Sequence, residues 1–85
     1  MKEFAYTIKD ELGIHARPAG LLIKEAAKFP CSITIAKDGK AVDAKRILGV
    51  MGLGVKCGQQ IVIAADGDQE EEAIATLSKF LEENL

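Results

Sequence analysis

The spacing of apolar residues switches repeatedly between two periods along this chain, and this switching constrains the fold more than any other feature. Alternating apolar and polar residues are typical of a strand with one buried face, whereas spacing at i, i+3, i+4 and i+7 is typical of an amphipathic helix. Alternation predicts strands over residues 2–8, 32–37, 40–43 and 60–65, and helical spacing predicts a helix over 18–28.

Turn and helix-ending residues mark the boundaries of these stretches. Pro30 ends the first helix, because proline cannot donate to the helical hydrogen-bond ladder. The Asp-Gly pair at 38–39 predicts a tight hairpin turn with positive φ at both residues, and the pair at 66–67 predicts a second turn. Asp68 and Glu71 have the spacing of a capping box, which predicts the start of the last helix.

The last helix and a short glycine-rich helix complete the order of elements. The glutamates at 70–72 fall in the first turn of the last helix, where the helix dipole favours acidic side chains. Residues 47–52 are predicted as a short helix followed by a loop, although their glycines lower helix propensity. The apolar face expected for the last helix comprises Ala73, Ile74, Leu77, Phe80 and Leu81.

The resulting order, β-α-β-β-α-β-α, predicts an α+β fold. A mostly antiparallel four-stranded sheet is expected to carry its helices on one face, with the other face largely solvated. At 85 residues, the chain is expected to form one domain over residues 1–85 with one small core. The apolar fraction of 48% and the charged fraction of 28% argue against disorder.

Charge and hydropathy exclude several classes of function. The net charge of −2 provides no overall basic field for nucleic acid or anionic lipid. The longest apolar run, residues 47–55, has nine residues including three glycines, so it is too short to span a bilayer. The first residues show no signal-peptide pattern, and a cytoplasmic location is therefore expected.

Neither cysteine belongs to a metal-ligand pattern. Cys31 and Cys57 are isolated along the chain, so two reduced thiols with a packing role are expected in a cytoplasmic protein. A disulfide between them stays open as the less favoured alternative. No metal or cofactor is expected, because the sequence has no ligand cluster and no G-x-x-x-x-G-K-[ST] phosphate loop.

The only histidine of the chain, His15, precedes the first predicted helix, and Arg17 and Pro18 follow it. Proline is favoured at the first helical positions, so His15 is expected at a helix N-terminus, where free backbone N–H groups suit an anion. A neutral imidazole is a nucleophile, and a nearby guanidinium can hold phosphate oxygens. These residues are consistent with a histidine that accepts a phosphoryl group. A cap, a surface residue or a core histidine is the more frequent role of a lone histidine.

Residues 13–19, Gly-Ile-His-Ala-Arg-Pro-Ala, resemble the active-site signature of the HPr family, the phosphocarriers of the phosphoenolpyruvate-dependent sugar phosphotransferase system. The resemblance covers the full length and implies an open-faced β-sandwich. It implies that His15 receives a phosphoryl group on Nδ1 from enzyme I and passes it to sugar-specific IIA proteins. Arg17, the amide of Ala16 and the helix N-terminus at Pro18 would hold the phosphoryl oxygens. The protein would be a stoichiometric, monomeric carrier and not an enzyme.

The stretch 47–54 is apolar on all sides, and a small domain cannot bury every side of such a helix. Some of its side chains are therefore expected at the surface, where an apolar patch is typical of a partner site. Val50 and Leu53 are better read as core. The resemblance implies that this segment and a basic rim on the first helix contact partners. The predicted partner surface comprises Gly20, Lys24, Arg46, Ile47, Leu48 and Met51.

Arg46 departs from the pattern of many Gram-positive HPr proteins, in which a serine begins the second helix and is phosphorylated from ATP by a dedicated kinase. Arginine has no hydroxyl, so this regulatory branch is expected to be absent. The guanidinium is instead expected to extend a basic rim formed with Arg17, Lys24 and Lys45, which would favour an acidic partner surface.

Two other classes of function stay open from the sequence. The first is an HPr-like regulatory or nitrogen-branch binding protein that does not serve sugar transport, although the presence of His15 and Arg17 argues against a lost phosphoryl site. The second, a ferredoxin-like metal or RNA module, is disfavoured because the chain lacks a C-x-x-C pair and an aromatic platform for stacking bases.

Overall fold

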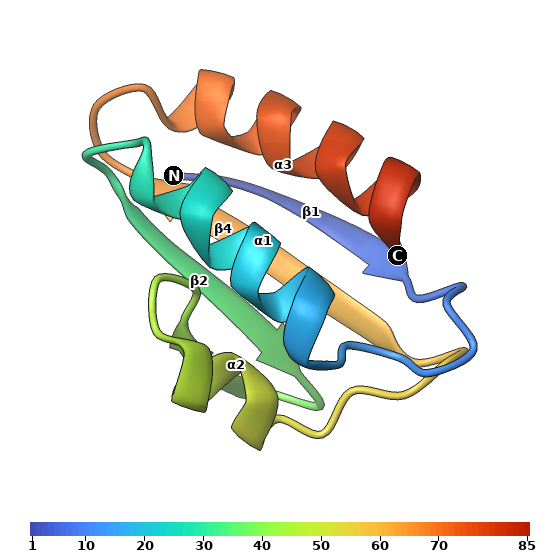
Figure 1. Ribbon diagram of the computed structural model, residues 1–85. Coiled ribbons are helices and arrows are strands. Elements are labelled where there is room, and N and C mark those ends of the chain that lie inside the picture. The colour runs from blue at the N-terminus through green and yellow to red at the C-terminus, as the bar shows by residue number, and fades with distance from the viewer.

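A computed structural model describes all 85 residues, and its elements follow the predicted order (Figure 1). The chain alternates between strand and helix as the apolar spacing indicates, and no element is missing or added. The elements are β1 (Lys2–Thr7), α1 (Ala16–Ala27), β2 (Ser32–Lys37), β3 (Lys40–Asp43), α2 (Ile47–Gly52), β4 (Gln60–Asp66) and α3 (Glu70–Asn84).

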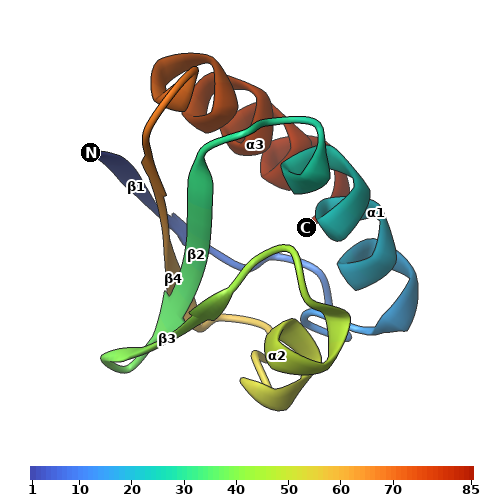
Figure 2. The same cartoon turned by 90° about the vertical axis from the view of Figure 1, so that its left-hand side faces the viewer.

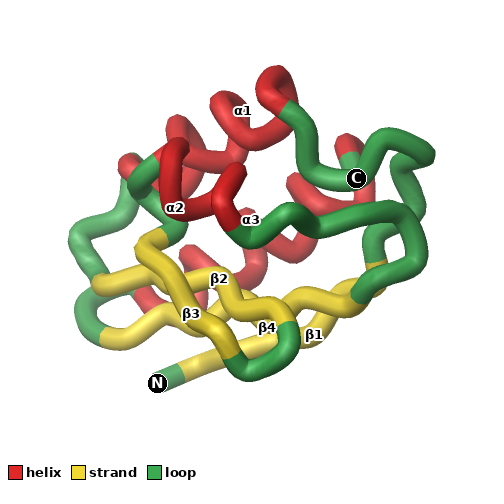
Figure 3. The backbone as a smooth tube through the Cα atoms, turned by 90° about the horizontal axis from the view of Figure 1, so that it is seen from below, coloured by secondary structure: helices red, strands yellow, loops and turns green.

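The four strands form one antiparallel sheet in the order β1-β4-β2-β3. Consecutive strands are neighbours only in the β2–β3 hairpin, because β4 inserts between β1 and β2. All three helices lie on one side of the sheet, as Figure 2 shows and as the separation of helices from strands in Figure 3 also shows. The predicted α+β open-faced sandwich is confirmed.

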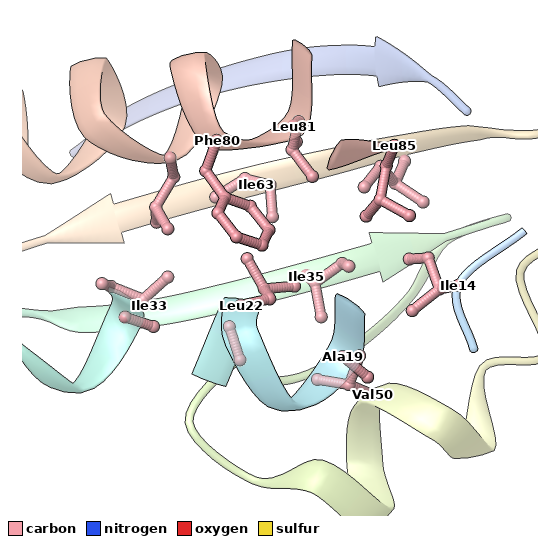
Figure 4. Packing of buried hydrophobic residues seen from close by; sticks show 14 of the residues in the cluster. Ile14, Ala19, Leu22, Ile33, Ile35, Val50, Ile63, Phe80, Leu81 and Leu85 are labelled. Atoms are coloured by element: carbon pink, nitrogen blue, oxygen red, sulfur yellow. The ribbon is translucent and has the colours of Figure 1, made fainter. Parts of the chain in front are cut away.

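The core lies between the sheet and the two longer helices. Side chains that alternate along β2 and β4 point toward α1 and α3, and the labelled residues of these elements meet in one cluster (Figure 4). Leu22 of α1 is fully buried in this cluster. Burial of such a side chain contributes about 1.5–3 kcal/mol relative to exposure. The predicted face of α3 is buried except for Ile74, which is half-buried.

The predicted turn at 38–39 has the expected backbone geometry, whereas at 66–67 only Gly67 has a positive φ and Asp66 still belongs to β4. Asp38 and Gly39 have φ values of 52° and 81°, as a type I′ turn between β2 and β3 requires. The boundaries of the elements differ from the prediction by one or two residues. The first helix begins at Ala16 and not at Pro18, because a proline in the first turn removes an N–H that has no partner within the helix.

The predicted capping box of α3 is wrong. Gln69 precedes the helix in a left-handed conformation with φ 65°, and no side chain caps the free N–H groups. This conformation places Asp68 outside the capping position. Glu70 instead bonds to a residue that precedes the helix: its Oε1 accepts a hydrogen bond of 3.1 Å from the N–H of Gly67. The predicted acidic first turn at Glu70–Glu72 is confirmed.

Lys45 does not belong to the predicted basic rim. Its Nζ donates hydrogen bonds to the carbonyl oxygens of Phe29, at 2.7 Å, and Cys31, at 2.8 Å. These carbonyls follow the C-terminal end of α1, where a cation is favourable. The ammonium group of Lys45 therefore joins the end of α1 to the start of β2.

The two cysteines are free thiols, as expected. Cys31 is buried, but Cys57 is exposed, so the predicted packing role is wrong for Cys57. No helix has both the length and the apolar character that crossing a membrane requires.

The free energy of unfolding is expected to depend on Glu70 in neutral but not in acidic solution. The Gly67 N–H, followed by the Met1 α-amino group at 3.0 Å, lowers the pKa of Glu70. A carboxylate whose pKa is lowered on folding stabilises the fold at pH values above its ordinary pKa. This contribution is lost as the pH falls through the folded-state pKa. Glu70→Gln should lower the melting temperature near pH 7, and the difference should disappear in acid.

Glu72→Gln is the control for this prediction, because Glu72 lies in the same helical turn and is exposed without an ion pair. It removes the same charge and should leave the melting temperature nearly unchanged. Equal melting curves for the wild type and Glu70→Gln at neutral pH would contradict the assignment.

Candidate functional site

The loop before α1 is held against the loop that precedes β4. Gly13 has φ 68°, and a Cβ atom at this position would lie 2.3 Å from the carbonyl oxygen of Val55 and 2.7 Å from the Cα of Lys56. The next amide, of Ile14, donates a hydrogen bond of 3.0 Å to the same Val55 oxygen. Only glycine permits this close approach, so Gly13 fixes where the chain turns into α1.

His15 is the residue immediately before α1, as the sequence predicts. Its backbone is extended, with φ −110° and ψ −178°, and its side chain makes no capping hydrogen bond. Its carbonyl oxygen accepts the 3.0 Å bond from the Ala19 N–H that begins the helix. The imidazole is 38% exposed. The ring therefore lies at the helix N-terminus, is accessible to solvent and does not cap the helix.

The helix N-terminus supplies donors beside the imidazole. The amides of Ala16 and Arg17 precede the N–H of Ala19, which makes the first intrahelical bond, so they lie among the helix donors without an intrahelical partner. Pro18 is buried and has no N–H, so it can shape the start of the helix at a phosphate site but cannot donate a hydrogen bond there. The helix dipole adds a favourable potential for an anion at this end.

An open hollow of about 230 Å³ lies at this end of the molecule and has room for a phosphoryl group. It brings together His15, Arg17 and Pro18, which the sequence predicted, and three residues that it did not. The lining residues are Asp10, His15, Arg17, Pro18, Leu21 and Asn84.

Asp10 is the functional candidate that sequence reasoning missed. Its Oδ2 lies 3.7 Å from His15 Nε2, and its Oδ1 accepts a 2.9 Å hydrogen bond from the Leu12 N–H. In the sequence, Asp10 is one polar residue among several in the loop. An aspartate that bonds to the amide two residues later is typical of an Asx turn, and this is the local signal that could have singled it out.

The apolar side chains of α2 divide between core and surface as predicted. Leu48 is 85% exposed, and Ile47 and Met51 are also exposed. Val50 is fully buried and Leu53 is nearly so.

The helix α2 packs beside α1, which carries Gly20 and the exposed Lys24 (Figure 2). An exposed apolar group thus lies on the element next to the His15 helix. Leu21, which lines the hollow, is an additional exposed apolar residue on α1 that the sequence analysis did not include.

Arg46 precedes α2, and its one ion-pair partner is Asp43. Its side chain is 82% exposed, and its Nε lies 3.7 Å from Asp43 Oδ2. An exposed pair of this kind contributes little energy, so the guanidinium stays accessible to solvent. No cluster of three or more histidine, cysteine, aspartate or glutamate side chains comes together anywhere in the structure to hold a metal.

Comparisons with known proteins point to one family. A family model described as the PTS HPr component phosphorylation site matches residues 2–83. The phosphocarrier protein HPr of Mycoplasma genitalium is 45% identical over 85 residues, which cover 99% of this chain and 97% of the relative.

Solved structures agree as well. The crystal structure of an HPr from Thermoanaerobacter tengcongensis is 48% identical, with a TM-score of 0.92 over 96% of this chain and 92% of that chain. A structure of an HPr dimer from the same organism is 47% identical, with a TM-score of 0.78 over 98% and 95%.

The family model covers residues 2–83, and the relatives named above are HPr proteins aligned over nearly the whole chain. The chain belongs to the HPr family of the phosphotransferase system.

Proposed function

We propose that His15 accepts a phosphoryl group from phosphorylated enzyme I, and ultimately from phosphoenolpyruvate, and passes it to IIA proteins for sugar uptake. The single observation that carries this proposal is the position of His15, whose side chain is free at the N-terminus of α1 with Arg17 in the same hollow. Membership of the HPr family supports the same reaction.

The residues at the site have separate roles in the proposed transfer. The Nδ1 lone pair of neutral His15 attacks phosphorus, and the bond from phosphorus to the donor atom of enzyme I breaks with its electron pair returning to the donor. Arg17 and the amides at the start of α1 offset the charge on the phosphoryl oxygens. Such a transfer depends on positioning and charge stabilisation and needs no base for the nucleophile.

The protein acts in this proposal as a stoichiometric carrier in the cytoplasm, without a cofactor. We expect it to act as a monomer. Because a dimer is described for the Thermoanaerobacter tengcongensis protein, the mass of this protein in solution should be measured directly.

The decisive experiment is incubation with phosphoenolpyruvate and enzyme I, followed by intact mass measurement before and after acid treatment. The wild type should gain one acid-labile phosphoryl group, and His15→Ala should gain none, because the chain has no other histidine. Ser32→Ala is the control and should be phosphorylated as the wild type is. An acid-labile phosphate on His15→Ala would refute the assignment.

Transfer onward distinguishes the sugar branch from the regulatory alternative. Phosphorylated protein should pass its phosphoryl group to a sugar-specific IIA protein. Phosphorylation by enzyme I without any transfer to such acceptors would indicate the regulatory or nitrogen branch.

Leu48→Glu should weaken binding to enzyme I and IIA proteins without loss of stability. Since Leu48 is 85% exposed, we expect a change of about 0.5 kcal/mol or less in the free energy of unfolding. A charge in the centre of an apolar interface should raise Kd by about tenfold or more, measured by calorimetry. Val50→Glu is the contrasting variant, because Val50 lies on the same helix but is fully buried, and it should unfold the protein.

Arg46→Asp should slow association with enzyme I by about 2- to 10-fold at low salt, provided that the partner surface is acidic. The difference should shrink as salt rises, because exposed charges are screened. Lys40→Asp makes the same charge change in the β2–β3 hairpin and is the control. Equal association rates at low salt would refute steering by Arg46.

A serine-specific HPr kinase should transfer no phosphate from ATP to this chain, since Arg46 has no hydroxyl.

A further inference from the structure

We propose that Asp10 is a positioning residue that holds the proton of neutral His15 on Nε2 and so leaves the lone pair on Nδ1. This inference rests on the proposed function and adds to it the residue that selects which ring nitrogen reacts. It concerns a side chain outside residues 13–19, which carry the family resemblance.

The orientation of the pair supports the proposal. Asp10 Oδ2 lies 3.7 Å from His15 Nε2, and no other hydrogen bond or ion pair is recorded for either atom. Asp10 is the only acidic residue among those that line the hollow, whose other polar members are Arg17 and Asn84. A carboxylate can only accept a hydrogen bond, so it favours the tautomer that carries the proton on Nε2.

Asp10 is held by hydrogen bonds to its neighbours, so the direction in which its carboxylate points is defined. Its N–H donates to the Leu85 carbonyl oxygen at 2.9 Å, its own carbonyl accepts from Gly13 at 2.9 Å, and Oδ1 accepts from Leu12 at 2.9 Å. The neighbouring amide, of Lys9, bonds to the same Leu85 oxygen. With the backbone and one carboxylate oxygen held, Oδ2 is the acceptor left to face the imidazole.

The separation of 3.7 Å exceeds that of a direct N–H···O hydrogen bond. Catalytic hydrogen bonds are often long in the resting structure and shorten in the reacting complex. The imidazole has room for this adjustment, because it is 38% exposed and serves no capping role.

The chemistry of both transfer steps gives the Nε2 proton a function. When Nδ1 forms its bond to phosphorus, the proton stays on Nε2, the ring becomes a cation, and the Asp10 carboxylate lies beside the new positive charge. In the onward step the acceptor group of the IIA protein forms its bond to phosphorus, while the Nδ1–P bond breaks and its electron pair returns to the ring. His15 then leaves as neutral imidazole with the Nε2 proton still in place, which is a better leaving group than an anion.

The first test is the tautomer of His15 itself, read from ¹⁵N shifts and long-range ¹H–¹⁵N couplings of the imidazole. At about pH 8.5, well above the ordinary titration range of imidazole, the wild type should show mainly the Nε2–H form. A wild-type ring protonated mainly on Nδ1 would overturn the proposal, whatever any variant does.

The second test is Asp10→Asn. The asparagine oxygen can keep the bond to the Leu12 N–H, which turns its NH₂ group, a donor, toward His15 Nε2. We expect the tautomer ratio to shift toward Nδ1–H and the rate of phosphorylation by enzyme I to fall about 10- to 100-fold, the loss typical when the hydrogen-bond partner of a metal-ligating histidine is removed.

Two control variants test whether the effect of Asp10→Asn is specific to its place beside His15. One changes a similar local structure elsewhere, and the other removes a negative charge elsewhere. Asp43 has nearly the same local geometry, with Oδ1 accepting from Lys45 N–H at 2.9 Å and Oδ2 lying 3.7 Å from Arg46 Nε. Asp43→Asn should therefore leave the His15 tautomer unchanged. Asp68→Asn removes one exposed carboxylate from the turn before α3 and should leave the transfer rate unchanged.

The outcomes are distinguishable. A slower Asp10→Asn with an unchanged tautomer would assign Asp10 a structural role and overturn the proposal, as would an unchanged rate. A wild type that enzyme I cannot phosphorylate would refute the proposed function instead, while the tautomer measurement would still decide whether Asp10 orients His15.

Discussion

Burial of one face of the sheet against α1 and α3 is the constraint on which the rest of the structure depends. Leu22 on α1 and Ile33, Ile35, Ile61 and Ile63 on β2 and β4 are almost completely buried, so neither a helix nor a strand can slip without exposing them. This packing holds α1 in one register over the sheet. The N-terminus of α1, with His15 before it, is therefore fixed at the end of the sheet where the chain enters β4.

A small domain can place a reactive side chain accurately only if the surrounding loops are held by backbone bonds. The loop before His15 is held on one side by the Gly13–Val55 contact and on the other by the bonds from Lys9 and Asp10 to Leu85. The functional groups therefore need not contribute to the fold. Arg17 is exposed and the imidazole of His15 makes no capping hydrogen bond, so neither side chain has to break a helix-capping bond in order to react.

The limited size of the core also explains the surface beside the site. The helix α2 has six residues, and Val50 buries its inner side while Leu48 stays in solvent. An apolar residue left exposed next to a reactive group allows recognition and transfer to use separate residues. Lys24 on α1 and Arg46 before α2 are exposed cations, whereas Lys45 is bonded to the end of α1.

The sequence by itself determined the order and approximate extent of every element, the 38–39 turn, the burial of Val50 and the position of His15 before a helix. These features follow from local rules, because apolar period, proline and the Asp-Gly pair act within a few residues. Only the tertiary structure decided the bonds of Lys45 to Phe29 and Cys31 and the approach of Asp10 to His15. These depend on where folded segments meet: Asp10 reaches His15 because its loop is anchored on Leu85, at the far end of the chain, and no local pattern encodes that contact.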